Sequence, residues 1–105
     1  MKSILYICDM KSAEILKILK EDKIFLKENF GVNRIALFGS FAKNTDKVDS
    51  DIDFFVELNH PSYNSLMNLY AYLEVKFQSK IDIVRKGPHL SEKFINSIQK
   101  DLIYA

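Results

Sequence analysis

The stretch from Gly39 to Leu58, "GSFAKNTDKVDSDIDFFVEL", decides how the chain folds. A Gly-Ser pair ends the short apolar run "IALF", and a polar segment follows it. The run "DIDFFVEL" then has apolar side chains at every second position, namely Ile52, Phe54 and Val56. Short apolar runs and runs of period two are both typical of β-strands. The stretch therefore predicts two strands joined by a polar connection that begins at the glycine.

Strand alternation also sorts the acidic residues of this stretch. Asp51 and Asp53 lie on one face of the second strand, about 6.6–6.8 Å apart along the chain. Two carboxylates that lie side by side repel each other unless a cation or a proton lies between them. Mg²⁺ is suited to this position, because it takes oxygen ligands and keeps waters that a phosphate can displace. The pair predicts a metal site at the start of the strand.

A third carboxylate is predicted to join the pair from another strand. Asp82 is central to "KIDIV", where Ile81 and Ile83 lie on the opposite face. If this strand lies beside "DIDFFVEL", Asp82 reaches the same pocket. Three carboxylates can hold two metal ions about 3.5–4 Å apart, an arrangement that stabilises the attacking and leaving oxygens of a phosphoryl transfer.

The Gly39-Ser40 pair supplies a complementary phosphate site. Glycine allows the backbone to approach a ligand closely. If a short helix begins at Ser40, its free N–H groups and the Ser40 hydroxyl can bind phosphate oxygens. The polyphosphate of a nucleotide would then be held here while the aspartates hold its metal.

The spacing Gly-Ser, ten residues, Asp-x-Asp resembles the signature of the minimal nucleotidyltransferases of the DNA polymerase β-like superfamily. The chain is most similar to the MntA-type antitoxins that pair with HEPN-domain toxins, and the resemblance covers almost its whole length. It implies a Mg²⁺-dependent protein adenylyltransferase that moves AMP from ATP to a tyrosine hydroxyl of the partner toxin and releases pyrophosphate.

The resemblance also implies a role for each matching residue. Gly39 and Ser40 would bind the triphosphate, and Asp51 and Asp53 would ligate both Mg²⁺ ions. Asp82 would ligate one ion and help to deprotonate the acceptor hydroxyl. The chain departs from the family at Lys43-Asn44, where Arg-Gly is common. Lys43 keeps a positive charge for phosphate binding but loses the bidentate geometry of an arginine.

The rest of the chain predicts further elements of an α+β fold. A helix is expected over 12–30, capped by Ser12, with a break near 21–23 and an end at Gly31. Further elements are expected as a helix capped by Ser62 that reaches Phe77, a strand "KIDIV", and a last helix that opens at Ser91 and includes Leu102. This order predicts one domain, 1–105, with the polymerase β-like nucleotidyltransferase fold: a small mixed sheet with helices mainly on one face.

Composition limits the functional classes. The chain has 105 residues, 48% of them hydrophobic and 28% charged, with a formal net charge of +1. Such a balance gives no support for direct nucleic-acid binding through a broad basic face. The single cysteine, Cys8, and the short apolar run before Asp9 favour a cytoplasmic protein with no membrane partner.

Other readings of the acidic residues are weaker. "DSDID" has the rhythm that starts an EF-hand loop, but Phe54 and His60 stand where Gly and Glu are required. Asp46 and Asp49 fit solvated loop charges, and Glu57 fits a structural role at the rim. Two functional alternatives stay open: a non-catalytic antitoxin that neutralises its partner by docking, and a nucleotidyltransferase that acts on a small-molecule hydroxyl.

Overall fold

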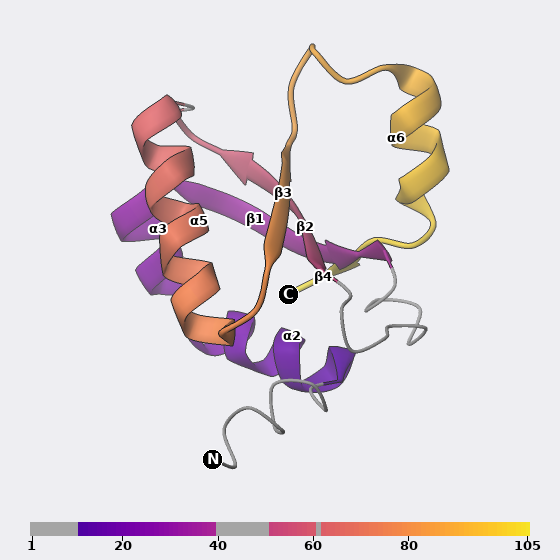
Figure 1. Cartoon of the computed structure of the whole chain (residues 1–105). Helices are drawn as coiled ribbons and strands as arrows, with labels where there is room; N and C mark the ends of the chain where they lie inside the picture. The colour runs from indigo at the N-terminus through magenta and orange to yellow at the C-terminus, as the bar shows by residue number, and fades with distance from the viewer. Residues whose placement is uncertain (1–10, 40–50, 61) are drawn as a thin grey trace.

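The computed structural model describes residues 11–39, 51–60 and 62–105 of the chain. Figure 1 shows a central sheet with helices around it. The described elements, in chain order, are α2 (Ser12–Glu21), α3 (Lys23–Phe30), β1 (Val32–Phe38), β2 (Ile52–Leu58), α5 (Tyr63–Phe77), β3 (Ile81–Arg85), α6 (Glu92–Gln99) and β4 (Ile103–Tyr104).

The sheet is mixed, as expected, and its strand order is β3-β2-β1-β4. β1 pairs antiparallel with both β2 and β4, whereas β2 and β3 are parallel. A parallel pair needs a crossover connection. The helix α5 supplies it, because it lies in the chain between β2 and β3.

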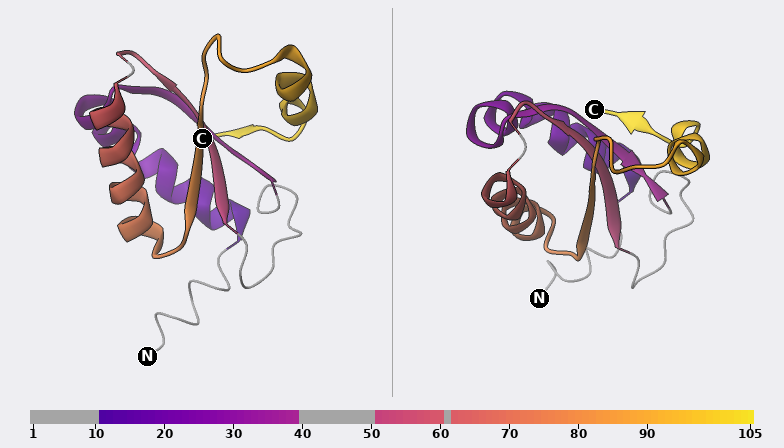
Figure 2. Two further views of the ribbon diagram at one scale, coloured as in Figure 1. Left: turned by 45° about the horizontal axis from the view of Figure 1, so that its top comes forward. Right: turned by 90° about the horizontal axis from the view of Figure 1, so that it is seen from above.

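Two apolar layers cover the two faces of the sheet. The larger core packs α2, α3 and α5 against one face; its fully buried side chains include Ile15, Leu26, Phe54 and Leu73. On the other face, Ala36 and Phe55 contact Ile98 of α6 in a smaller cluster. Figure 2 shows α6 on the opposite side of the strands from α5. The expectation that helices lie mainly on one face is confirmed, and α6 is the exception.

Several helix ends agree with the sequence. The hydroxyls of Ser62 and Ser91 accept hydrogen bonds from backbone N–H groups three residues later, each at 3.1 Å. Gly31 ends α3 in the left-handed conformation, with φ 69°. The break between α2 and α3 falls at Asp22, inside the expected interval. The prediction for Ser12 is wrong: it is the first helical residue, and the cap position is Lys11.

The C-terminal segment differs from the expected helix. α6 ends at Gln99, so Leu102 lies beyond it and packs on the smaller cluster instead. Ile103 and Tyr104 form β4, pairing with Leu37 and Ala36 of β1. Two residues are too few to show strand periodicity in the sequence. They form a strand by pairing with the edge of β1.

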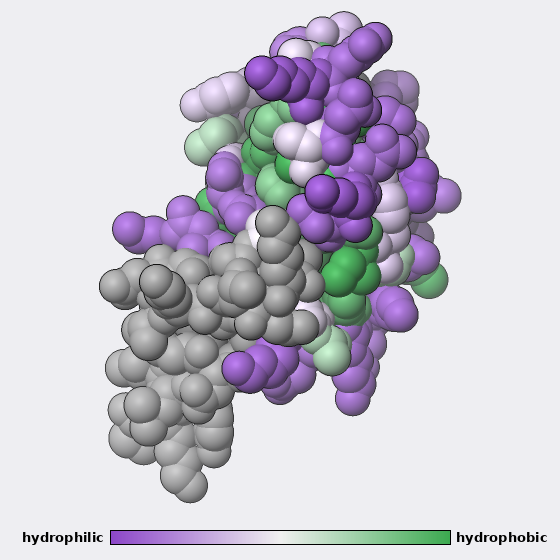
Figure 3. All heavy atoms as spheres, turned by 90° about the vertical axis from the view of Figure 1, so that its right-hand side faces the viewer, coloured by the Kyte–Doolittle hydropathy of each residue, from purple (hydrophilic) through white to green (hydrophobic). Residues whose placement is uncertain are grey.

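On the coloured part of the side that carries α6, hydrophilic residues are the most extensive, with smaller apolar areas between them (Figure 3). Among the described residues, no helix has both the length and the apolar character needed to cross a membrane.

Candidate active site

Asp53 and Asp82 occupy matched positions on neighbouring strands. In the parallel pairing of β2 with β3, Asp53 is the register partner of Asp82. Phe54 and Ile83, the next residues on each strand, both belong to the larger core. Since successive side chains of a strand point to opposite faces, the two aspartates lie together on the other face. The expectation that "KIDIV" lies beside "DIDFFVEL" is confirmed.

Asp51 precedes the first residue of β2 and is exposed. Its negative charge still acts on Asp53, whose pKa is raised to about 6. Burial of the carboxyl is the largest cause of this rise, and the charges of Asp82 and then Asp51 add to it. The structure thus brings Asp51 and Asp82 within electrostatic reach of Asp53.

A glycine is required beside these carboxylates. Gly39 follows β1 directly and has φ +77°, a conformation that other residues rarely adopt. A Cβ atom at this position would overlap Oδ2 of Asp53 and would lie 3.0 Å from its Cγ. Gly39 therefore lets the backbone at the end of β1 pass directly under the Asp53 carboxyl group.

The carboxylates fit a hard cation in chemistry but do not form a preassembled site. Carboxylate oxygens are ligands that Mg²⁺ prefers, and a bound cation would relieve the repulsion that, together with burial, raises the pKa of Asp53. Within the described ranges, no three His, Cys, Asp or Glu side chains converge closely enough to hold a metal ion. The metal roles of Asp51, Asp53 and Asp82 stay predictions.

Other site residues named from the sequence lie outside the described ranges. Ser40 and Lys43, the two expected phosphate contacts beside Gly39, are among them, as are Asp46 and Asp49. Glu57 is described, and its carboxylate lies 3.5 Å from Arg34 and 3.8 Å from Lys86. Such ion pairs agree with the rim role expected for Glu57.

Tyr70, a residue of α5, is a neighbour of the site that the sequence analysis did not single out. Its hydroxyl accepts a hydrogen bond of 3.0 Å from the Ile83 N–H and lies 3.5 Å from Oδ1 of Asp82. The ring packs against the larger core. No sequence pattern signals the polar contact, because it depends on how α5 lies against β3.

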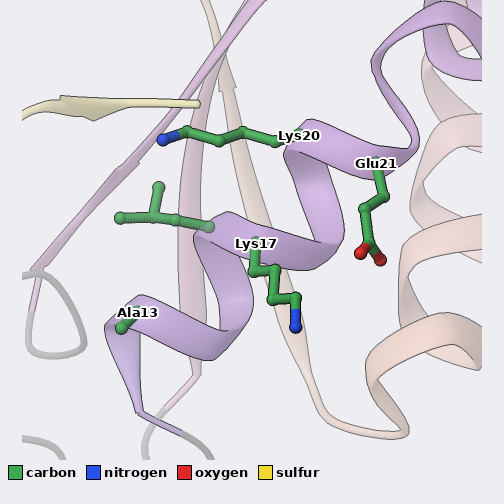
Figure 4. A pocket seen from close by; sticks show the side chains of 5 residues that line it. Ala13, Lys17, Lys20 and Glu21 are labelled. Atoms are coloured by element: carbon green, nitrogen blue, oxygen red, sulfur yellow. The ribbon is translucent and has the colours of Figure 1, made fainter.

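A pocket of about 500 Å³ lies on α2, away from the aspartates. It is lined by Ala13, Leu16, Lys17, Lys20 and Glu21, and Figure 4 shows that these side chains all project from one helix. None of the site residues named above lines it. We do not assign it to the candidate site.

Comparison with known proteins identifies the type of domain. Residues 15–105 match the model of the family described as polymerase beta, nucleotidyltransferase. A protein of Methanocaldococcus jannaschii, provisionally named a protein adenylyltransferase, is 39% identical over 95 residues, covering 88% of this chain and 95% of its own length. Protein adenylyltransferase MntA of Thermococcus cleftensis is 34% identical over 92 residues, covering 87% of this chain and 92% of its own length.

Solved structures show the same fold. One provisionally described as a minimal nucleotidyltransferase has a TM-score of 0.73 at 25% identity, and the match covers 90% of this chain and 95% of that one. A chain from a crystal structure of a toxin–antitoxin with AMP-PNP has a TM-score of 0.52 at 31% identity. That match covers 64% of this chain and 57% of the other.

Proposed function

This chain belongs to the polymerase beta nucleotidyltransferase family, and from that premise we propose that it is the antitoxin of a HEPN/MNT pair, transferring AMP from ATP to a tyrosine hydroxyl of its partner toxin. The observation that carries the proposal is the pairing of Asp53 with Asp82 across parallel strands, beside a glycine at which a Cβ atom would overlap the Asp53 carboxyl group. The names of the relatives support the adenylyl group and the protein acceptor.

The proposed reaction exchanges the phosphoanhydride bond between the α- and β-phosphates of ATP for a phosphoester bond to the acceptor oxygen. The oxygen of the acceptor hydroxyl attacks the α-phosphorus of ATP, the bond from that phosphorus to the bridging oxygen breaks, and pyrophosphate leaves. Asp82 takes part in removing the hydroxyl proton. Asp51 and Asp53 would hold two Mg²⁺ ions and Asp82 one of them; when bound, these ions neutralise phosphate charge and stabilise the attacking and leaving oxygens.

The proposed phosphate contacts begin at Gly39, directly after β1. Gly39 brings the backbone close to the Asp53 carboxyl group, so a triphosphate held by Gly39, Ser40 and Lys43 would lie next to the metal-binding carboxylates. Most of the rate would come from positioning and electrostatics rather than covalent catalysis.

A partner protein is the proposed source of the acceptor. Four helices and four strands account for most of the described residues, and they form one layer of helices, one sheet and a single helix behind it. No separate acceptor-binding domain is present among them. Similarity to a toxin–antitoxin structure that contains AMP-PNP supports both the partner and the nucleotide.

The test is label transfer onto the partner. The chain is co-expressed and purified with a HEPN-domain toxin, the proposed partner, and is incubated with Mg²⁺ and ATP labelled at either the α- or the γ-phosphate. Label is expected on the partner only from the α position. Asp51→Asn with Asp53→Asn is expected to abolish it. Glu57→Gln, on the same strand but bound to Arg34 and Lys86, is the matched control.

Two results would contradict the proposal. Undiminished labelling by the double Asn variant would exclude these carboxylates from the reaction. A partner that is fully inhibited by the double Asn variant, and whose mass is unchanged in both complexes, would instead establish a non-catalytic docking antitoxin.

A further inference from the structure

We infer that Tyr70 is a positioning residue that orients Asp82, through a hydroxyl group that bridges the outer edge of β3 and the Asp82 carboxylate. The inference rests on the proposed function, since it concerns a proposed metal ligand. It goes beyond that function because it assigns a role to a residue of α5, a helix that supplies none of the proposed metal or phosphate contacts.

The peptide groups on the outer edge of β3 have no strand partner among the described residues. Within the described sheet, β3 is an edge strand whose one strand neighbour is β2. On the β2 side, the Lys80 carbonyl oxygen accepts a hydrogen bond from the Ile52 N–H at 3.0 Å. The Lys86 N–H donates to the Val56 carbonyl oxygen at 2.8 Å. Because the peptide groups of a strand alternate in direction, the N–H of Ile83 points away from β2 and needs another partner.

Tyr70 provides that partner. The Ile83 N–H donates to the Tyr70 hydroxyl oxygen at 3.0 Å. The tyrosine ring is held by the larger core, so the hydroxyl position is set by packing as well as by this bond. Between them, the core and the strand edge place a single O–H group next to Asp82.

The hydroxyl proton has two possible acceptors. Oδ1 of Asp82 lies 3.5 Å from the Tyr70 oxygen, and the Ile83 carbonyl oxygen lies 3.4 Å from it. A carboxylate that carries charge accepts a stronger hydrogen bond than a neutral carbonyl group. Donation to Asp82 therefore prevails when Asp82 is ionised, and it restricts the rotation of an otherwise exposed side chain toward one rotamer.

The chain offers a matched control two residues along the same helix. The Tyr72 hydroxyl donates to Oδ2 of Asp22 at 2.5 Å, at the junction of α2 and α3. Tyr72→Phe also removes a hydrogen-bonded hydroxyl from α5, but one that is bonded to none of the three site aspartates. Tyr70→Phe keeps the ring in the core and removes only the oxygen.

The test measures Mn²⁺ binding, with Mn²⁺ replacing Mg²⁺ as a paramagnetic probe, by electron paramagnetic resonance in the presence of AMP-PNP. Tyr70→Phe is expected to weaken binding about tenfold, as loss of a partner of a metal ligand commonly does. Tyr72→Phe is expected to bind as the wild type. In an Asp82→Asn background, Tyr70→Phe is expected to cause no further loss.

A second measurement needs neither metal nor activity. Amide hydrogen exchange of Ile83, followed by NMR in metal-free protein, is expected to accelerate in Tyr70→Phe and to keep its wild-type rate in Tyr72→Phe. Equal Mn²⁺ affinity in Tyr70→Phe and wild type would overturn the inference alone. Equal Mn²⁺ affinity in the wild type and in the variant that combines Asp51→Asn with Asp53→Asn would overturn the proposed function, and this inference with it.

Discussion

Gly39 lies so close to Asp53 that a Cβ atom on the glycine would overlap Oδ2 of the carboxyl group and would lie 3.3 Å from the Asp53 Cβ. The glycine at the end of β1 and the aspartate at the second position of β2 are therefore one structural unit. Asp53 is in turn the register partner of Asp82, so the same contact links the glycine to both strands that carry carboxylates.

Gly39→Ala is expected to abolish AMP transfer while the fold persists. The new methyl group must displace the Asp53 carboxyl group. The left-handed backbone costs a further amount of about 1–2 kcal/mol for a residue with a Cβ atom. Label transfer and thermal unfolding check the two effects. Gly31→Ala is the control, since its Cβ would meet nothing nearer than 3.9 Å at a similar φ. Full transfer by Gly39→Ala would contradict the close contact.

Asp53→Asn is expected to stabilise the metal-free protein at pH 7.5 by about 1 kcal/mol. This is less than the free energy that corresponds to the whole pKa shift, because the carboxyl group is partly solvated. The pKa of Asp53 is raised from 3.8 to about 6 on folding. Its ionisation therefore destabilises the folded state progressively as pH rises between these values, and the cost is complete above pH 6. An amide avoids that cost.

The check is thermal unfolding of wild type and Asp53→Asn in EDTA at pH 4 and pH 7.5. The gain in stability is expected at pH 7.5 and nearly absent at pH 4, where the wild-type carboxyl is protonated in the folded state. An equal gain at both values of pH would show that charge repulsion and burial are not its cause.

Divalent-cation binding is expected to weaken below pH 6 and to release protons there. A ligand must be deprotonated before it binds a metal, and the pKa of Asp53 lies at about 6 in the metal-free protein. Lowering the pH from 7.5 to 5 should weaken Mg²⁺ binding about tenfold. Titration calorimetry in two buffers of different ionisation enthalpy measures the protons released. Affinity that is independent of pH over this range would argue against Asp53 as a ligand.

Asp82→Asn is expected to reduce AMP transfer at least 100-fold, because it removes both a proposed metal ligand and the group that helps to deprotonate the acceptor. Label transfer under saturating ATP measures the loss. Asp101→Asn, near the end of α6, serves as a charge-matched control. Retention of full activity by Asp82→Asn would leave Asp82 as a neighbour of the site rather than part of it.

Leu73→Ala is expected to destabilise the fold by about 2–5 kcal/mol, because Leu73 is buried between α5 and the sheet. Val75→Ala, two residues along the same helix, is 75% exposed and is expected to change stability by less than about 0.5 kcal/mol. Denaturant unfolding of both variants checks the difference, and similar losses would place α5 in a different orientation on the sheet.

Local features of the fold could be predicted because each depends on residues close together in the chain. The period of two in 51–58 identifies β2, and serines before apolar helices identify the starts of α5 and α6. The two-residue β4 could not be predicted, since it pairs with β1, which lies far from it in the chain.

The sequence by itself determined which residue types are available for the site: Gly39-Ser40, a pair of aspartates at period two, and Asp82 between two isoleucines. Only the tertiary structure decided that β3 lies parallel to β2 in the register that pairs Asp82 with Asp53. It also decided that the Tyr70 hydroxyl meets the edge of β3. Strand order and helix docking are set by long-range burial of apolar surface, and no short window of sequence contains both partners of such a contact.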